Sequence, residues 1–455
     1  MKTYKLFITG SLLVGGLLFS SCDNKLDVQP RNSLDSKDAL KTQTDLQALL
    51  VGAYDALGDG DLYGGNLQRN AELLGDNGEA TWDGTFIDPG QIYRKQILVT
   101  NQDVANMWIS AYSTINICNT VLANLDLATD ANEKTRIEGE AKFIRGSMYF
   151  ELVRLFAKSW GDGDANTNPG VPLVLTPTTT ISNSDFVSRS TVAQVYAQVI
   201  KDLTDAEAKI PISNDFYASS GAAAAMLSRV YLQQSNYAAA ANAANRVIQS
   251  NQYKLVDLGD VFDLRFFVNG RDTEETILSM QVTDQDGVNN LNLYYIDEGW
   301  GGRGDIYIEN RHLSQYETAD NRGGLFYQDD AGLIRTAKFV NKYGNIQVLR
   351  LAEMYLTRAE ANFQNGSSIG ATPLADINLI RSRAGLGALT SAQLNLNAIL
   401  KERRLELAFE GTQIHDIKRT RRSIGNIRYN ADRLVYPIPQ REILANKSLI
   451  QNSGY

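Results

Sequence analysis

The apolar residues of this chain recur with the period of an α-helix, and two such stretches are joined by a turn of only two residues. Ala222–Gln234 and Tyr237–Ser250 are amphipathic and rich in alanine, and Ser235 and Asn236 lie between them. A connection this short forces two helices to pack antiparallel, and alanine where they cross allows the backbones to approach closely. The pattern predicts a tetratricopeptide-like helical hairpin.

Other segments have the same periodicity. Apolar residues are spaced three or four apart in Thr135–Ala157 and in Met107–Leu125, and Leu351–Gln364 followed by Leu374–Ala384 repeats the hairpin. No strict 34-residue period runs through the chain, which argues against a plain repeat adaptor. We therefore expect a mainly α protein of tetratricopeptide-like hairpins, an α-α superhelix with long irregular loop insertions and a little β structure.

Three long insertions separate the helical stretches. Gly58–Gln96, Ser159–Asp185 and Gln252–Gln347 are rich in glycine, aspartate, asparagine and aromatic residues, with little helical periodicity. A short β-like run, Thr276–Val282, lies inside the third. Loops this long in a folded protein usually carry function, so we expect the binding residues there.

The N-terminal segment has the order of a secretory signal. Lys2 and Lys5 precede an apolar run of 14 residues (6–19), and the small residues Ser20 and Ser21 lead to Cys22. The run is shorter than the roughly 20 residues that a membrane-spanning helix needs. A cysteine in this place resembles a bacterial lipobox, in which Cys22 is acylated after residues 1–21 are removed. The alternative is an ordinary signal in which Cys22 is incidental.

Composition limits the partners and the number of domains. The formal net charge is −8, which disfavours nucleic acid, because binding to phosphates needs lysine and arginine. No second long apolar run exists, so the membrane link would be the lipid alone. We predict an acylated N-terminus and tether over 22–40, and a single domain over 41–455 with an N-terminal part to about 250 and a C-terminal part from about 251. Cys118, in an apolar helical stretch, is interpreted as a small buried hydrophobe.

A catalytic interpretation finds little support in the sequence. His312 and His415 are the only histidines, and they are far apart and without metal-ligand spacing. No G-x-S-x-G elbow occurs, and the glycine-rich segment 299–304 has no lysine, so it is not a phosphate-binding loop. Two carboxylates that hydrolyse a glycoside need no local motif. We predict that the protein is not an enzyme, with a glycan-cleaving surface lipoprotein as the alternative.

Two loop clusters have the residue types that bind sugars. A pyranose has a C–H face and a hydroxyl rim, and Trp and Tyr offer an apolar face together with a polar group. One cluster lies around Trp82, and the other around Trp300, whose glycine neighbours cannot cover it. The alternative is that these aromatics hold the loops on the helical body. The predicted ligand-binding residues are Trp300, Arg303, Tyr294, Tyr295, Trp82, Asp76, Asn77 and Tyr63.

One acidic loop has the spacing of a calcium loop in part. Oxygen-bearing side chains alternate at Asp162, Asp164, Asn166 and Asn168. The glycine of position six is missing, and Leu173 stands where position twelve needs Glu. The pattern favours a solvated, Asx-rich turn, with structural calcium as the weaker alternative. No other cofactor is expected.

Several segments, in order, resemble the SusD/RagB family of outer-membrane nutrient-binding lipoproteins. Trp108–Asn119 matches the helix W-x-x-x-Y-x-x-I-N-x-x-N, and Glu140–Phe150 resembles E-A-x-F-x-R-A-x-x-Y-F. Arg350–Ala361 matches R-x-A-E-x-x-L-x-x-A-E-A, and Asn378–Gly385 is similar to N-x-I-R-x-R-A-G. Glu402–Gly411 and Tyr436–Pro439 complete the set. With the lipobox, the resemblance covers nearly the whole chain.

The resemblance implies a fold and a function. Members have a rigid body of four tetratricopeptide-like hairpins with a variable loop region. They sit as a lid on a SusC-like TonB-dependent transporter in the outer membrane, face the outside, and capture nutrient oligomers, usually glycans. We therefore expect a lipid-anchored receptor that binds an oligosaccharide and delivers it to such a transporter. A tetratricopeptide-like protein-interaction scaffold without a small ligand is a further alternative.

Overall fold

The alanine-rich stretches form the predicted hairpin. In the computed structural model, which describes residues 40–180 and 182–455, these stretches are α8 (Ser220–Gln233) and α9 (Tyr237–Gln249). The Asn236 side chain accepts a hydrogen bond from Ala239 N and so starts α9. The two helices pack on each other, and most of their alanines are buried: residues 222–225 of α8, and Ala240, Ala241, Ala243 and Ala244 of α9. Small side chains therefore let the two backbones approach, as predicted.

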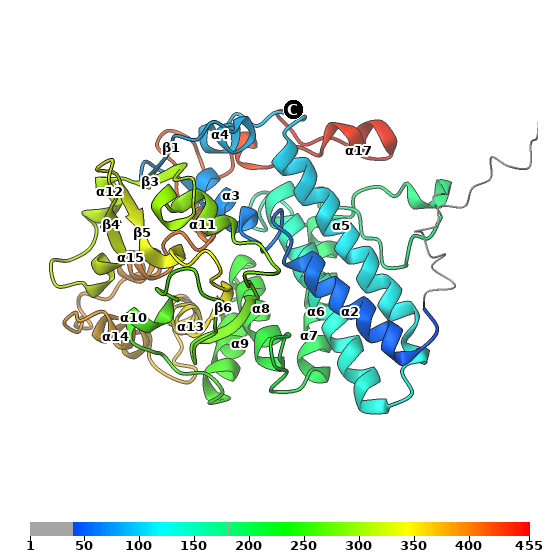
Figure 1. Cartoon of the computed structure of the whole chain (residues 1–455), viewed down its shortest axis with the longest axis horizontal. Coiled ribbons are helices and arrows are strands. Elements are labelled where there is room, and N and C mark those ends of the chain that lie inside the picture. The colour runs from blue at the N-terminus through cyan, green and yellow to red at the C-terminus, as the bar shows by residue number, and fades with distance from the viewer. Residues whose placement is uncertain (1–39, 181) are drawn as a thin grey trace, which may run out of the picture. The chain divides into compact units, whose positions relative to one another are not determined.

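The remaining helices and strands follow along the chain (Figure 1). The longer helices are α2 (Gln43–Leu57), α3 (Asn66–Gly75), α4 (Ile87–Arg94), α5 (Gln102–Ala123), α6 (Ala131–Phe156), α7 (Val192–Lys209), α13 (Leu351–Asn365), α14 (Pro373–Arg383) and α15 (Leu396–Glu406). The short ones are α10 (Leu258–Val261), α11 (Asn290–Tyr295), α12 (Asn310–Leu313), α16 (Gln413–Arg419) and α17 (Gln440–Ala445). The strands are β1 (Ala80–Trp82), β2 (Thr276–Met280), β3 (Ile306–Ile308), β4 (Phe326–Gln328), β5 (Ile334–Thr336) and β6 (Ile346–Arg350).

Consecutive helices pack on one another through most of the chain. Helix α2 lies against α5 and α6, α6 packs on α7, α7 on α8, and α9 on α13, which then contacts α14 and α15. Figure 1 shows α2, α5, α6 and α7 side by side, and β1, β3, β4 and β5 gathered near α11 and α12. The prediction of a mainly α protein built from helical hairpins with a little β structure is confirmed.

The insertion Gly58–Gln96 is more ordered than its sequence indicates. It contains α3 and α4, although little helical periodicity is present. All ten residues of α3 are buried, including Arg69 and Glu72. A helix that is enclosed on every side has no polar face, so its sequence lacks the alternation on which a helix prediction depends. The expectation of an irregular loop here was wrong.

Three antiparallel strand pairs connect segments that are far apart in the sequence. Strand β1 pairs with β3, with Trp82 opposite Ile306, and so joins the first insertion to the third. Strand β2, the predicted β-like run, pairs with β6 just before α13. Strands β4 and β5 form a hairpin within the third insertion. The loops that carry the predicted binding residues are therefore tied to each other and to the helical body.

A buried network of charges connects the C-terminal elements. Arg350, at the end of β6, pairs with Glu275, Glu406 and Glu410 at 2.7–2.9 Å. Arg403 on α15 lies 2.9 Å from Asp416. Burial alone would raise the pKa of Glu353, but Arg229 and Arg403 outweigh it and lower that pKa to about 2. Removing one member would leave the network with an excess buried charge, and breaking a buried ion pair in this way costs about 3–5 kcal/mol. These buried ion pairs hold β6, α13, α15 and α16 together with the segment at Glu275.

Part of the N-terminal predictions lies outside the described residues. The signal over 1–21, the acylated Cys22 and the tether up to residue 39 belong to the segment that the structure leaves undescribed. Residues 42–455 form one compact unit. Within the described part, no helix has both the length and the apolar character to cross a bilayer. Cys118 is buried on α5, and burial raises the pKa of its thiol to about 12.

Candidate functional site

The two predicted aromatic clusters meet in space, because β1 pairs with β3. The ring centroids of Trp82 and Tyr294 lie 5.8 Å apart. Phe86, which follows Trp82, is 45% exposed, and the Arg303 guanidinium lies over its ring at 4.4 Å. The sequence therefore pointed to two halves of one region.

Most of the predicted residues of this region are enclosed. Tyr63 is buried and donates to Glu151 at 2.7 Å, and Tyr295 is buried against Phe339 and Phe409. A ring that is covered in this way cannot stack on a sugar. For Tyr63 and Tyr295 a packing role therefore replaces the predicted binding role.

Trp82 and Tyr294 are also nearly covered, with 7% and 8% of their surface exposed. The Arg69 guanidinium lies over the Tyr294 ring at 4.1 Å. These two rings form the wall behind Phe86 and do not offer a free face. The alternative that loop aromatics hold the loops on the body applies to both.

Asp76 and Asn77 shape the turn before β1. The Asp76 carboxylate accepts hydrogen bonds from the backbone N–H groups of Gly78, Glu79 and Ala80, each at 2.9 Å. Asn77 Oδ1 accepts from Gly425 N at 2.9 Å. The Asp76 carboxylate is buried and occupied by the protein itself, so turn formation replaces its predicted ligand contact. Asn77 is partly exposed, and its predicted ligand contact stays a prediction.

Beside the predicted Arg303, which is exposed, Trp300 is the predicted aromatic residue that remains accessible. It ends the short 3-10 helix η3 (Glu298–Trp300), which Asp297 caps by accepting from Gly299 N at 2.9 Å. Tyr327 donates to the other Asp297 oxygen at 2.6 Å. The carboxylate of Asp297 therefore starts this short helix and ties it to Tyr327 on β4. Trp300 itself is partly exposed.

Phe266 covers one face of Trp300, which the sequence did not reveal. The two rings are stacked, with centroids 3.7 Å apart and planes at 19°. Phe266 is 41% exposed and the next residue, Phe267, is 49% exposed. The sequence did contain a signal for this contact: three consecutive apolar residues, Phe266–Val268, in an otherwise polar loop. Exposed apolar groups of this size usually mark a place where another group binds or packs.

Gly301 allows this cluster to close. Its φ is +85°, in the left-handed region that favours glycine. A Cβ at this position would lie 3.1 Å from the Lys342 side chain and 3.2 Å from the Phe267 ring. The absence of a side chain thus brings the Trp300 platform, Phe267 and Lys342 together.

An open groove of about 310 Å³ adjoins this cluster through Gly301 and Lys342, and the rings of Trp300, Phe266 and Phe267 are not among its lining residues. Its lining also includes Tyr343 and the loop 282–288. Aspartate and amide side chains, among them Asp284, Gln285, Asp286 and Asn290, supply the hydrogen-bonding groups. An aromatic edge with polar groups beside it suits the two faces of a sugar ring. This groove is the candidate binding site.

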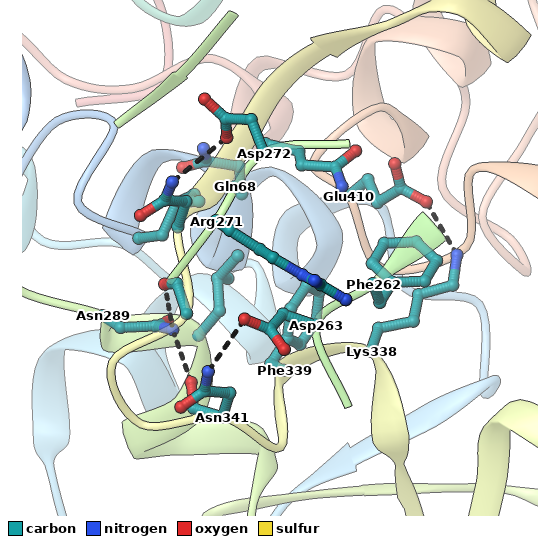
Figure 2. Close-up of a pocket in the computed structure, with 15 residues that line it drawn as sticks. Gln68, Phe262, Asp263, Arg271, Asp272, Asn289, Lys338, Phe339, Asn341 and Glu410 are labelled. Carbon is teal, nitrogen blue, oxygen red and sulfur yellow. Dashed lines mark hydrogen bonds and ion pairs between the residues drawn. The ribbon is translucent and has the colours of Figure 1, made fainter. Parts of the chain in front are cut away.

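A second, smaller cavity shares the residue Asn289 with the groove (Figure 2). Asn289 lines both spaces, and its side chain donates to the backbone oxygens of Asn341 and Gly344 at 3.2 and 3.0 Å. On the far side, Lys338 pairs with Glu410 at 2.7 Å. The space measures about 30 Å³, enough for one or two water molecules and too small for a sugar ring. The hydrogen bonds of Asn289 in this cavity therefore hold the wall of the groove in place, and the cavity itself is not a sugar site.

The acidic loop of the second insertion forms the turn that its sequence favours. Asp164 Oδ1 accepts from the Asn166 backbone at 2.9 Å, and Asn168 donates to the backbone oxygen of Asp162 at 2.6 Å. Among the residues that the structure describes, no group of three His, Cys, Asp or Glu side chains could hold a metal ion. The calcium alternative at Asp162, Asp164, Asn166 and Asn168 stays an untested prediction.

Comparison with known proteins agrees with this arrangement. Residues 25–232 match a family described as starch-binding and associating with the outer membrane, and residues 249–433 match the SusD family. The chain belongs to the SusD family. The predicted family resemblance is confirmed.

Individual SusD-family relatives match over nearly the whole chain. SusD-like protein P2 of Formosa agariphila is 26% identical over an alignment that covers 100% of both chains. A SusD superfamily protein from Bacteroides thetaiotaomicron is 26% identical, with a TM-score of 0.82 over 90% of this chain and 99% of that structure. A putative sugar binding protein from Bacteroides vulgatus, 24% identical and with a TM-score of 0.82, shares the fold.

Proposed function

We propose that this SusD-family chain is a lipid-anchored receptor that binds a glycan in the groove beside Trp300. The observation that carries the proposal is the stacked Phe266–Trp300 pair, a partly exposed aromatic surface that adjoins the polar groove through Gly301. Large exposed apolar groups normally mark an interaction site. The family description as starch-binding and outer-membrane-associated agrees with a sugar ligand.

Binding without turnover is part of the proposal. The solved relatives that have a function in their names are called sugar or carbohydrate binding proteins. In the groove, the oxygens of Asp284 and Asp286 lie in an open loop, and Thr283 N and Gly287 N already donate to oxygens of Asp286. Such groups can accept hydrogen bonds from sugar hydroxyls. We expect no product when glycans are incubated with the purified chain.

A glycan array tests the binding proposal. The mature chain is compared with Trp300→Ala, Phe266→Ala and the matched control Phe186→Ala, whose ring is 39% exposed outside the groove. We expect the first two variants to lose at least about tenfold in affinity, because a buried aromatic contact contributes roughly 1–2 kcal/mol. The control should bind like the unaltered chain. Equal binding by all four proteins would reject the groove as the site.

The anchor and the partner of the receptor are the finer parts of the proposal. We propose that Cys22 is acylated, that the receptor faces the outside of the outer membrane, and that it passes its ligand to a SusC-like TonB-dependent transporter. Replacing Cys22 with Ser should release the protein from membranes in a fractionation experiment, and co-purification from detergent extracts should recover the transporter. A membrane-bound Cys22→Ser variant would contradict the anchor.

A further inference from the structure

The groove beside Trp300 continues beyond the loop that forms its far wall. Asp286 and Gly287 line this groove and also a second hollow of about 280 Å³. The other wall of the second hollow consists of Tyr54 on α2 and the pair Phe216 and Tyr217 between α7 and α8. Each hollow is near the lower end of the roughly 300–1,000 Å³ of small-ligand sites. A ligand that crosses the loop at residues 286–287 would occupy both.

The second hollow repeats the arrangement of exposed and supported rings that is found at Trp300. Phe216 is 65% exposed. Tyr217 packs on Tyr54 with ring centroids 4.7 Å apart, and the Tyr54 hydroxyl accepts from Ala218 N at 3.1 Å. Asp215, with φ +48°, turns the chain immediately before Phe216. The rings of Tyr54 and Tyr217 are thus held by packing and a hydrogen bond, which lowers the entropy that binding against them would cost.

The charges around the two hollows have mostly one sign. Asp284 and Asp286 line the first hollow, and Asp55 and Asp286 line the second. Lys342 lines the first hollow, and it is the one basic side chain among the residues that line either hollow. A ligand with carboxylate or sulfate groups would place like charges near these aspartates, which costs affinity. Aspartate oxygens accept hydrogen bonds from hydroxyl groups without this repulsion.

We infer that the ligand is an uncharged oligosaccharide long enough to contact the Trp300 platform and the Phe216 subsite at the same time. The inference rests on the proposed function and adds to it the second subsite, the minimum length and the charge class of the ligand. Stacking at two separate platforms favours an oligomer over a monosaccharide. Once one end of an oligomer is bound, its other end is held near the second platform, so the second contact forms at a high effective concentration.

The experiment compares chain lengths and charges of the ligand. An array of neutral oligosaccharides, oligogalacturonates and sulfated oligosaccharides is applied to the full chain, and a length ladder of the neutral oligosaccharide bound most tightly is then titrated calorimetrically. The proteins are the unaltered chain, Trp300→Ala, Phe216→Ala and the control Phe186→Ala. Phe216 is highly exposed, so its replacement should leave the fold intact, and thermal unfolding checks this directly.

The expected result is a gain of about tenfold in affinity at the length that reaches the second hollow. Phe216→Ala should remove that gain and leave the affinity for shorter ligands unchanged, whereas Trp300→Ala should weaken binding at every length. Raising the salt concentration should not strengthen binding of the neutral ladder.

Other outcomes separate the inference from the proposed function. If Phe216→Ala matches the unaltered chain at every length while Trp300→Ala loses affinity, the second subsite is rejected and the receptor function stands. If oligogalacturonates or sulfated oligosaccharides bind more tightly than neutral ones, the charge class is rejected. If Phe216→Ala instead impairs only co-purification with the transporter, the ring belongs to a protein interface. No binding to any oligosaccharide would reject the proposed function itself.

Discussion

The two histidines should make the stability of this protein depend on pH in a range where few other side chains titrate. His312 and His415 are the only histidines, and both are buried. Burial lowers the pKa of His312 to about 4, despite a contact of 2.8 Å with Glu79. Burial also lowers the pKa of His415 well below its ordinary value. Both side chains are therefore neutral in the folded protein near pH 7.

The sign of the effect follows from these depressed pKa values. The unfolded chain has histidine pKa values of about 6.5, so it takes up protons before the folded chain as the pH falls. The contribution to stability is complete above pH 6.5 and is lost from about pH 6.5 down to about pH 4. At pH 5.0, about 1.5 pH units below the unfolded pKa, the loss for His312 is about 2 kcal/mol.

Urea unfolding at pH 7.5 and pH 5.0, followed by tryptophan fluorescence, measures this loss. His312→Asn removes the titrating group, so its destabilisation should be about 2 kcal/mol smaller at pH 5.0 than at pH 7.5. The control Phe326→Leu alters a ring 5.6 Å from the His312 ring and keeps the histidine. Its destabilisation should be equal at both pH values. The reasoning is refuted if His312→Asn also destabilises equally at both.

Three other positions give separate tests. Gly301→Val should lower stability by about 1–3 kcal/mol, because its φ of +85° suits glycine, and it should abolish glycan binding; Gly323→Ala, in open space, should do neither. Glu406→Gln should lower stability by about 3–5 kcal/mol in thermal unfolding, because Arg322, Arg350 and Arg383 all lose one buried acidic partner. A comparable loss for Glu317→Gln, whose side chain is half-exposed, would contradict this account. Buried Cys118 should react with a maleimide only after unfolding, and rapid labelling of the native protein would show that the helix opens.

The helical body could be predicted from sequence because its information is local. The hairpin of α8 and α9 was found from alanine content, amphipathic spacing and the turn at Ser235 and Asn236, all within a few residues of one another. Predicted ends differ from the observed ones by a few residues, as at Thr135–Ala157, where α6 begins at Ala131. Short-range patterns decide where helices form but do not sharply decide where they end.

The site could be predicted only in part because it depends on contacts between distant residues. Trp300 was found from its glycine neighbours, yet its stacking partner Phe266 lies in a separate loop. Tyr63 and Trp300 have the same kind of loop composition around them, but Tyr63 is buried against Glu151 and Trp300 is not. Composition identifies aromatic residues that could bind, whereas exposure is decided by tertiary packing.

The pairing of β1 with β3 restricts how this protein can vary. Successive side chains of a strand point to opposite faces, so adding or deleting one residue between Asp76 and Trp82 would turn Trp82 to the wrong side of the pair. The loop at residues 283–287 lies outside every described strand and has no such constraint. Length changes in related chains should therefore accumulate at residues 283–287, and laboratory libraries that aim to change ligand preference should insert residues there.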